Sequence, residues 1–424
     1  MDEDIVDVKG DPAKAEAAPA YRWVVIGTFA VNYGLGWGIL SILGLLLPAI
    51  SEELNLSPSG EGLLGSSAVW ANIVMAIPLG LWASRCRAKA FTTATILLGV
   101  LFVFGQGWAP NFWVLVVARV LFGLAILGRE PARAILTQQW IPLREIVIAN
   151  SIFIVAIGVG ESLVFGLTPF ILSGFNDDWR NTMYLFGVVA IIPGILWVVL
   201  GRERSRPQSR TTEVSSEVSP LMVLLKYRSL WIAGLAIFGN FVAWTTFIVF
   251  WPTYMLETFD LSLKASGFVL AVFTIGSVIG NLSVAYFMLK SDRRKIFFII
   301  SGVGMTGSAV TMLVTDYVPL LAILGIANSL TWAFYFSIAR TIPFEQPGIT
   351  TRELAVAVSF LEMAMWVGSA VGPLITALVR EASGSFFSGL LITSLFYLTV
   401  TIAGLVLPRR ASPYPSLAAD AAKE

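Results

Sequence analysis

Long apolar stretches recur along the whole chain, and each is long enough to cross a lipid bilayer as a helix. A helix needs about 20 apolar residues to cross roughly 30 Å of hydrocarbon. Twelve stretches meet this requirement, at about 21–50, 60–84, 90–108, 111–135, 146–173, 180–201, 230–256, 265–289, 296–315, 317–341, 353–379 and 384–407. They predict an all-α membrane protein with twelve transmembrane helices.

Composition excludes several other classes of protein. Hydrophobic residues make up 56% of the 424 residues and charged residues only 13%, which is too apolar for a soluble domain. The chain has no histidine, so imidazole proton relays are excluded, and its lone Cys86 excludes a cysteine-based metal site. A net charge of +1 gives no field that attracts nucleic acid. We therefore expect no metal, no cofactor and no nucleic-acid partner.

One long polar segment divides the apolar stretches into two groups of six. Residues 202–229 predict a cytoplasmic linker between an N-terminal bundle, 21–201, and a C-terminal bundle, 230–408. Most of the 28 Lys and Arg residues fall in this linker, in the two tails and in the loops on the same side. Because basic residues remain in the cytoplasm, both termini are predicted to be cytoplasmic. The tails are residues 1–20 and residues 409–424. Residues 1–20 are acidic and then Ala/Pro-rich, so we expect them to be disordered, and they lack the pattern of a signal peptide.

The fourth and fifth stretches carry a spaced set of residues that is typical of one family. The set comprises Arg119, Gly123, Pro131, Ala132, Trp140, Pro142, Glu145, Ala149 and Asn150. This pattern resembles the helix 4 to helix 5 segment of the major facilitator superfamily, with spacing closest to its anion:cation symporter branch. Ile126 stands where that branch usually carries an acidic residue. The resemblance implies two pseudo-symmetric six-helix bundles around a central site.

Two loops are similar to the signature loops of the same superfamily. The first runs from Gly80 to Lys89, with Ser84 at the usual Asp position, and the second, from Lys290 to Lys295, keeps an Asp. The resemblance implies a gating role for Arg85, Lys89, Asp292 and Arg293. Anchoring of the loops at the cytoplasmic face is the alternative interpretation.

Two charged residues lie deep in consecutive helices. Arg119 is roughly 12 Å below the outer surface if its helix begins near Asn111, and Glu161 lies at an overlapping depth in the next helix. A charge at that depth needs a partner or access to water. An Arg119–Glu161 pair would serve either substrate or proton coupling, or would simply hold two helices together. We predict Arg119 as the main contact for an anionic substrate, because guanidinium binds carboxylate in a bidentate manner.

Other charged residues divide between the membrane interior and its cytoplasmic edge. The depth arithmetic places Arg129, Glu130 and Arg133 near the cytoplasmic rim, and Arg340 at the cytoplasmic end of its helix. Glu362 is expected near the midplane without a cation beside it. Because hydrocarbon favours the neutral form of a carboxylic acid, Glu161, Glu362 and Glu130 are the predicted proton-coupling residues. A neutral acid held for packing is the alternative for Glu362.

The superfamily resemblance implies that helices 1, 4, 7 and 10 line the central cavity. Polar and aromatic residues on these helices are therefore candidate substrate contacts, with filling of the bundle core as the alternative for the tryptophans. They are Asn32, Tyr33, Trp37, Asn240, Trp244, Thr245, Asn328, Trp332 and Tyr335. The run from Gly368 to Pro373 is predicted to let two helices pack closely.

These features together predict a secondary transporter rather than an enzyme. We expect a small organic solute, most simply an organic anion coupled to the proton gradient, to cross by alternating access of the two halves. No phosphate-binding Gly-rich motif for ATP is present. An exporter of amphipathic compounds and a non-transporting membrane receptor or assembly factor are the alternatives. We expect a monomer in the lipid bilayer of a bacterial inner membrane.

Overall fold

The computed structural model describes residues 20–142, 145–204, 224–288, 294–346 and 348–407, and within them every regular element is helical. The first half contains α1 (Arg22–Ser41), α2 (Leu43–Leu54), α3 (Pro58–Arg85), α4 (Ala88–Trp108), α5 (Phe112–Leu127), α6 (Arg129–Trp140), α7 (Ile146–Gly174) and α8 (Trp179–Leu200). The second half contains α10 (Arg228–Phe259), α11 (Leu263–Met288), α12 (Arg294–Thr311), α13 (Val318–Ala339), a 3-10 turn (Ile342–Glu345), α14 (Thr351–Ser383), α15 (Phe386–Leu395) and α16 (Leu398–Val406).

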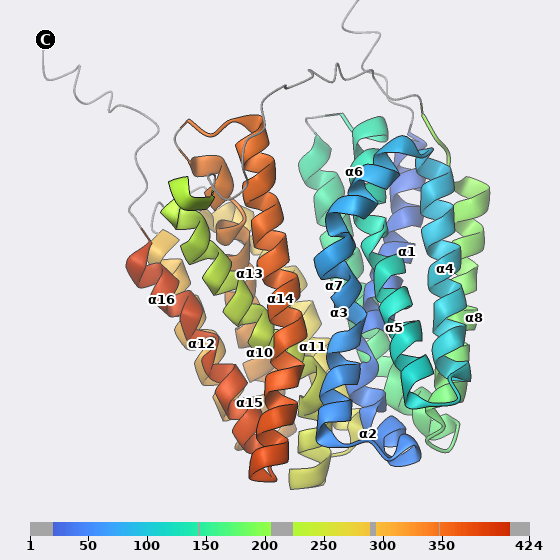
Figure 1. Ribbon diagram of the computed structural model, residues 1–424, viewed down its shortest axis with the longest axis vertical. Coiled ribbons are helices and arrows are strands. Elements are labelled where there is room, and N and C mark those ends of the chain that lie inside the picture. The colour runs from blue at the N-terminus through green and yellow to red at the C-terminus, as the bar shows by residue number, and fades with distance from the viewer. Residues whose placement is uncertain (1–19, 143–144, 205–223, 289–293, 347, 408–424) are drawn as a thin grey trace, which may run out of the picture.

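The helices form two bundles that stand side by side, with α3 and α7 of the first half against α14 and α11 of the second (Figure 1). In Figure 1, α1 begins and α16 ends at the upper end of the molecule. We call this the inner end and the opposite one the outer end, after the orientation that the basic residues predict.

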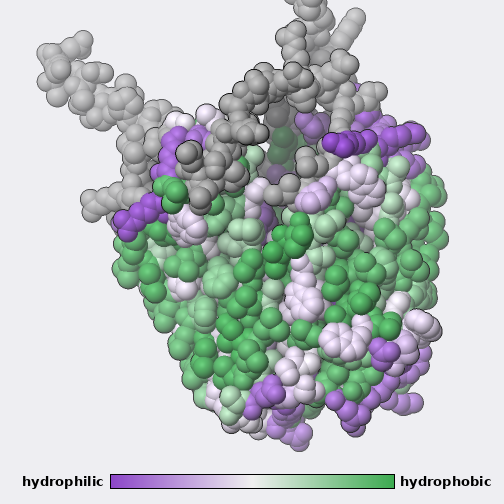
Figure 2. Space-filling model, in the orientation of Figure 1, coloured by the Kyte–Doolittle hydropathy of each residue, from purple (hydrophilic) through white to green (hydrophobic). Residues whose placement is uncertain are grey.

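The helices are long and apolar enough to make this a multi-pass membrane protein. Within the described residues, ten helical segments meet the length and hydropathy of a membrane span. The predicted stretches 60–84 and 296–315, which are not among these ten, are occupied by α3 and α12. Figure 2 shows apolar side chains covering the middle of the molecule and hydrophilic side chains gathered towards both ends. This distribution matches a belt of hydrocarbon between two aqueous surfaces.

Glycines allow helices of one bundle to touch backbone to backbone. A Cβ atom on Gly368 of α14 would clash with the carbonyl group of Phe238 in α10, and one on Gly372 would clash with that of Val242. The close packing that the Gly368 to Pro373 run predicts is thus confirmed. Gly34 of α1 lies equally close to the carbonyl group of Ala156 in α7.

The fourth predicted helix is interrupted near its middle by one residue, Gly128, whose backbone stays in the right-handed helical region. It divides at Gly128 into α5 and α6, and the amide of Gly128 donates to the carbonyl oxygen of Leu124 at 3.0 Å. Pro131 explains the position, because a proline ring clashes with the carbonyl group four residues earlier, which here belongs to Leu127. The helix is therefore loosened next to Pro131, and α6 need not continue the axis of α5.

Candidate functional site

Arg119 lies inside the first bundle, where neutral groups surround it. Its side chain is only 2% exposed. Nη1 donates to Oε1 of Gln106 at 3.3 Å and Nη2 donates to the carbonyl oxygen of Leu40 at 3.4 Å. Glu161 of α7 instead accepts a hydrogen bond from Ser41 Oγ at 3.0 Å. Since Leu40 and Ser41 are consecutive in the chain, this part of α1 gives Arg119 and Glu161 separate partners, and the two do not pair.

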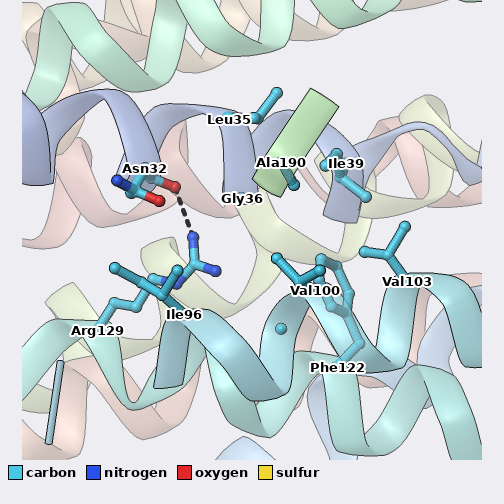
Figure 3. A pocket seen from close by; sticks show the side chains of 11 residues that line it. Asn32, Leu35, Gly36, Ile39, Ile96, Val100, Val103, Phe122, Arg129 and Ala190 are labelled. Atoms are coloured by element: carbon cyan, nitrogen blue, oxygen red, sulfur yellow. Dashed lines mark hydrogen bonds between the residues drawn. The ribbon is translucent and has the colours of Figure 1, made fainter. Parts of the chain in front are cut away.

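Arg129 is also buried, which contradicts the prediction that it lies at the cytoplasmic rim. Its side chain is 5% exposed, and Nη1 donates to the carbonyl oxygen of Asn32 at 2.5 Å (Figure 3). Gly36 and Gly99 leave room for the guanidinium, because a Cβ atom on either would clash with it. A cavity of about 10 Å³, roughly the size needed for one water, lies beside it. The depth arithmetic ended the helix too early, because α6 continues to Trp140, eleven residues or roughly 16 Å beyond Arg129.

Glu130 and Arg133 form the centre of a polar cluster, which we call the first charged cluster. Tyr33 donates its hydroxyl to Glu130 Oε1, and Arg133 donates to Glu130 Oε2 through Nε at 3.3 Å and Nη2 at 3.2 Å. Nη1 of Arg133 donates to Oδ1 of Asn150 at 3.2 Å. About 30% of each of the Glu130 and Arg133 side chains is exposed. They are partners in one solvent-accessible network, so interface anchoring does not describe them.

The second half contributes a matching ion pair. Arg340 donates to Glu362 Oε1, and the two side chains are 50% and 33% exposed. The expectation that Glu362 lacks a cation is therefore wrong, because the long Arg340 side chain extends from the end of α13 to the neighbouring α14. Glu362 also interacts electrostatically with Arg133 and Glu130 of the first half. Charged side chains of opposite sign from the two halves are therefore close to one another.

Aromatic rings surround these charges. The rings of Trp37 and Trp366 are nearly parallel, at 11°, with their centroids 6.1 Å apart across the two halves. Trp244 and Trp332 stack within the second half at 6.2 Å, and Trp332 stacks in turn on Phe336 at 4.9 Å. The guanidinium of Arg340 lies 5.3 Å from the centre of the Phe336 ring. Trp366 was missed from the sequence, although it lies four residues after Glu362 and so on the same helix face.

The polar candidates are mostly placed inside a single bundle. Asn32 donates to the carbonyl oxygens of Thr28 at 3.0 Å and Pro193 at 2.8 Å. Asn328 donates to Met305 O at 3.0 Å and Ser308 Oγ at 2.9 Å. Asn240 and Tyr335 are fully buried, with polar side-chain atoms that have no partner in the described part of the chain, and Thr245 is half-buried. Within the described part of the chain, Tyr33 is the predicted substrate contact that hydrogen-bonds to Glu130 of the first charged cluster.

The predicted gating loop of the first half contacts a residue that follows α8. Arg85 is exposed and Lys89 is half-buried. Glu203 accepts from Nε of Arg87 at 3.1 Å and from the backbone amide of Ala88 at 2.9 Å. Asp292 and Arg293 lie outside the described residues. Glu203 was not singled out from the sequence.

A further ionic contact joins the two halves at the outer end. Arg380 of α14 donates through Nη1 to Glu61 Oε2 of α3 at 2.5 Å, and its Nη2 lies 3.4 Å from Glu257 of α10. Ser51 donates to the other oxygen of Glu61 at 2.5 Å. The largest buried apolar cluster also combines residues of both halves, including Leu46 and Phe247. These contacts join the two halves at the outer end.

The inner end is hollow beside the first charged cluster. A cavity of about 580 Å³ is lined by Arg133, Thr137 and Asn150, together with residues from the end of α6 to the start of α7. This volume lies in the range of small-molecule binding sites. Arg133 is therefore reachable by a small solute from the inner end.

Known proteins share both the sequence pattern and the fold. The chain is 25% identical to the gentisate transporter of Corynebacterium glutamicum over 308 residues, covering 71% of this chain and 68% of that protein. It is 23% identical to the probable L-galactonate transporter of Escherichia coli over 397 residues, covering 88% and 84%. An inward-facing bacterial homologue of the lysosomal transporter Spinster has the same fold, with a TM-score of 0.76 at 16% identity over 93% of this chain and 99% of that one.

The family assignment rests on most of the chain. The family model of the Major Facilitator Superfamily matches residues 29–349 and 233–423. These two ranges together reach into both helical bundles and include the first charged cluster and the Arg340–Glu362 pair. The resemblance seen in the helix 4 to helix 5 segment is thus confirmed. The chain belongs to the Major Facilitator Superfamily, whose members are membrane transporters and not enzymes.

Proposed function

We propose that this protein is a proton-coupled secondary transporter of small organic anions that works by alternating access. In this proposal all twelve predicted stretches cross the membrane, both termini are cytoplasmic, and the protein acts as a monomer in a bacterial inner membrane. The names of the two relatives support an anionic substrate, since gentisate and galactonate are both carboxylates.

The observation that supports this proposal most directly is a pair of Arg–Glu contacts, one in each half, that lie near each other. Arg133 is held by Glu130 in the first half, and Arg340 by Glu362 in the second. Guanidinium binds a substrate carboxylate in the same way as a protein carboxylate. A substrate anion therefore competes with Glu130 and Glu362 for the two arginines.

This competition gives a direct route to proton coupling. When a proton neutralises Glu130 or Glu362, the carboxyl group loses its charge and its hold on the neighbouring arginine weakens. The freed guanidinium then accepts the anionic substrate, so proton and anion are loaded together. Glu161 is a further proton carrier in this scheme, because its described partner is the neutral hydroxyl of Ser41.

The shape of the molecule supports alternating access. The outer end is closed by Arg380 and Glu61, whereas the cavity at the inner end reaches Arg133. In the proposed cycle this arrangement is the inward-facing state. Release of the Arg380–Glu61 contact, together with closure around the inner cavity, would produce the opposite state.

Uptake into proteoliposomes tests the proposal. With gentisate or galactonate outside and an imposed inward proton gradient, the wild-type protein should accumulate the anion. Glu130→Gln and Glu362→Gln should abolish accumulation but keep exchange of labelled for unlabelled substrate, since a neutral side chain cannot carry the proton. Arg22→Gln, which removes a cation paired with Glu145 within the first half, is the matched control. Normal accumulation by both Gln variants would disprove the coupling scheme.

A further inference from the structure

Two carboxylates and one guanidinium meet where the two halves touch at the outer end. Arg380 of α14 donates to Glu61 of α3 at 2.5 Å, and its Nη2 lies 3.4 Å from Glu257 of α10. Glu61 belongs to the first half, whereas Arg380 and Glu257 both belong to the second. One positive charge therefore serves two negative charges, and the contact with Glu61 is the one that joins the halves.

The two carboxylates differ in their access to water. The side chain of Glu61 is 6% exposed, whereas that of Glu257 is 49% exposed. Water stabilises the charge on Glu257, but the charge on Glu61 depends on Arg380 and on Ser51, whose hydroxyl donates to its other oxygen at 2.5 Å. A proton on Glu61 would therefore remove the excess negative charge at the position that water reaches least.

The charged surroundings of Glu61 come from the second half. The ionised groups that interact with it electrostatically are Arg380 of α14 and Glu257 of α10. On α2, the carboxylate of Glu53 is paired within the first half. Helices α5 and α6 also pack against α3, but Arg119 of α5 has its partners inside the first half, and the charges of α6 lie towards the inner end. The charge state of Glu61 therefore acts mainly on its contact with the second half.

Arg380 keeps partners in its own half when Glu61 is neutral. Its guanidinium carbon lies 3.5 Å from the centre of the Phe386 ring of α15, a cation–π contact, and Glu257 remains beside Nη2. Protonation of Glu61 therefore leaves no unpaired charge buried between the halves, in contrast to removal of the Arg380 side chain.

The contact lies where α3 and α14 pack closely together. A Cβ atom on Gly62, the residue after Glu61, would lie 2.4 Å from Cβ of Ala377 and 2.9 Å from the carbonyl oxygen of Pro373. Separation of the two halves at this point therefore requires Glu61 and Arg380 to move apart.

We propose that Glu61 is a proton-binding site at the outer end, and that a proton arriving from the outer side releases Arg380 and lets the two halves separate there. This inference rests on the alternating access of the proposed function, but not on its substrate or on Glu130 and Glu362. A proton on Glu61 favours the state in which the outer end is open.

Distances between spin labels on the purified full-length protein test this site. Labels on Trp113→Cys and Tyr317→Cys, two exposed positions at the outer ends of different halves, report their separation in a Cys86→Ser background. In this otherwise unchanged protein, the population with the longer distance should increase at least about threefold between pH 8 and pH 5. Glu61→Gln should show the larger population at both pH values, because a neutral amide cannot hold Arg380 as a carboxylate does.

Two further carboxylate variants distinguish Glu61 from its neighbours. Glu53→Gln, the matched control, removes an outer carboxylate that is paired with Arg180 inside the first half, and it should keep the full response to pH. Glu257→Gln removes both the excess negative charge and the partner of Arg380 in its own half, so the response should move to lower pH. A distance distribution that does not change with pH, or a Glu61→Gln variant that still responds to pH, would overturn the assignment.

The same measurement in Glu130→Gln/Glu362→Gln separates this inference from the proposed function. The response should persist there, since both substitutions lie towards the inner end. If it disappears there and persists in Glu61→Gln, the inner glutamates carry the response and Glu61 is not the site. Failure of anion accumulation in proteoliposomes, with the response at Glu61 intact, would refute the proposed function alone. Melting temperatures identify any variant that has lost its fold.

Discussion

Arg380 of α14 and Glu61 of α3 form an ion pair that joins the two halves at the outer end, with 2.5 Å between Nη1 and Oε2. Both side chains are largely buried, at 19% and 6% exposure. Removal of one partner from such a pair leaves a charge in an apolar setting, which costs on the order of 3 kcal/mol. The contact therefore favours the conformation in which the outer end is closed.

We expect Arg380→Gln to open the outer end more often. Accessibility is measured by thiol labelling of Ala377→Cys, a buried residue of α14 that packs against Gly62 of α3, in a Cys86→Ser background. The labelling rate should rise about fivefold or more, because the closed state has lost an interaction between the halves.

Arg180→Gln provides the matched control for this experiment. Arg180 also lies at the outer end and pairs with Glu53 at 2.8 Å, but both residues belong to the first half. Its loss should leave the labelling rate within twofold of the starting protein. An equal increase in both variants would mean that general loosening, and not the contact between the halves, controls access.

Replacing Arg133 and replacing Arg119 by a neutral residue should have very different effects on the affinity for a carboxylate. Arg133→Met should weaken binding of a carboxylate by more than tenfold, since the guanidinium is partly exposed beside the inner cavity. Arg119→Met should change it by less than about twofold, because Arg119 contacts Gln106 and Leu40 inside the bundle. Equilibrium binding by thermal shift or calorimetry gives both values. The reverse order would return substrate binding to Arg119.

The pH dependence of anion binding should follow Glu362. In the wild-type protein, affinity should increase as pH falls, because in the proposed mechanism a proton on Glu362 releases Arg340. The double variant Glu130→Gln/Glu362→Gln carries no carboxylate at either position, so it should bind the anion at pH 8 as well as at pH 6. Affinities measured at both pH values provide the comparison, and a double variant with an unchanged pH profile would refute this assignment.

The space around the Arg129 guanidinium should not accommodate a side chain at position 36. Gly36→Ala places a methyl group against Nη1 of Arg129, which must give up its hydrogen bond to Asn32 O inside the bundle. We expect a loss of about 2 kcal/mol in unfolding free energy, the cost of leaving a buried polar group without its partner. Thermal unfolding in detergent measures the effect. Gly27→Ala, on the same helix with open space around it, should be close to neutral.

Helix positions were predictable from sequence because hydrophobic length is a local property. The stretch predicted at 146–173 is α7, Ile146–Gly174, and the stretch at 317–341 contains α13. The break in helix 4 was also predictable, since Pro131 marks it. The pairing of Arg340 with Glu362 was not, because depth along a straight axis says nothing about how far a long side chain reaches sideways.

Which residues form the site depends on which helix faces meet, and the sequence alone did not predict those faces. Trp366 and Asn150 carry no depth signal of their own, and each enters the site through a neighbour on another helix. Arg119 looked functional because it is a charge within hydrocarbon, yet Gln106 and the Leu40 carbonyl are neutral acceptors that the sequence does not mark. Spacing rules describe neighbours on one helix, whereas this site is assembled from several.

The interruption at Gly128 separates two groups of cations that share one predicted helix. Arg119 belongs to α5, which is packed into the outer part of the first half, while Arg133 belongs to α6 beside the inner cavity. In a continuous helix, a displacement of Arg133 would be carried along the axis to Arg119. Because Pro131 has no amide hydrogen to bind the carbonyl group of Leu127, the junction lacks one hydrogen bond of a regular helix, and a tilt of α6 need not be carried in full to α5.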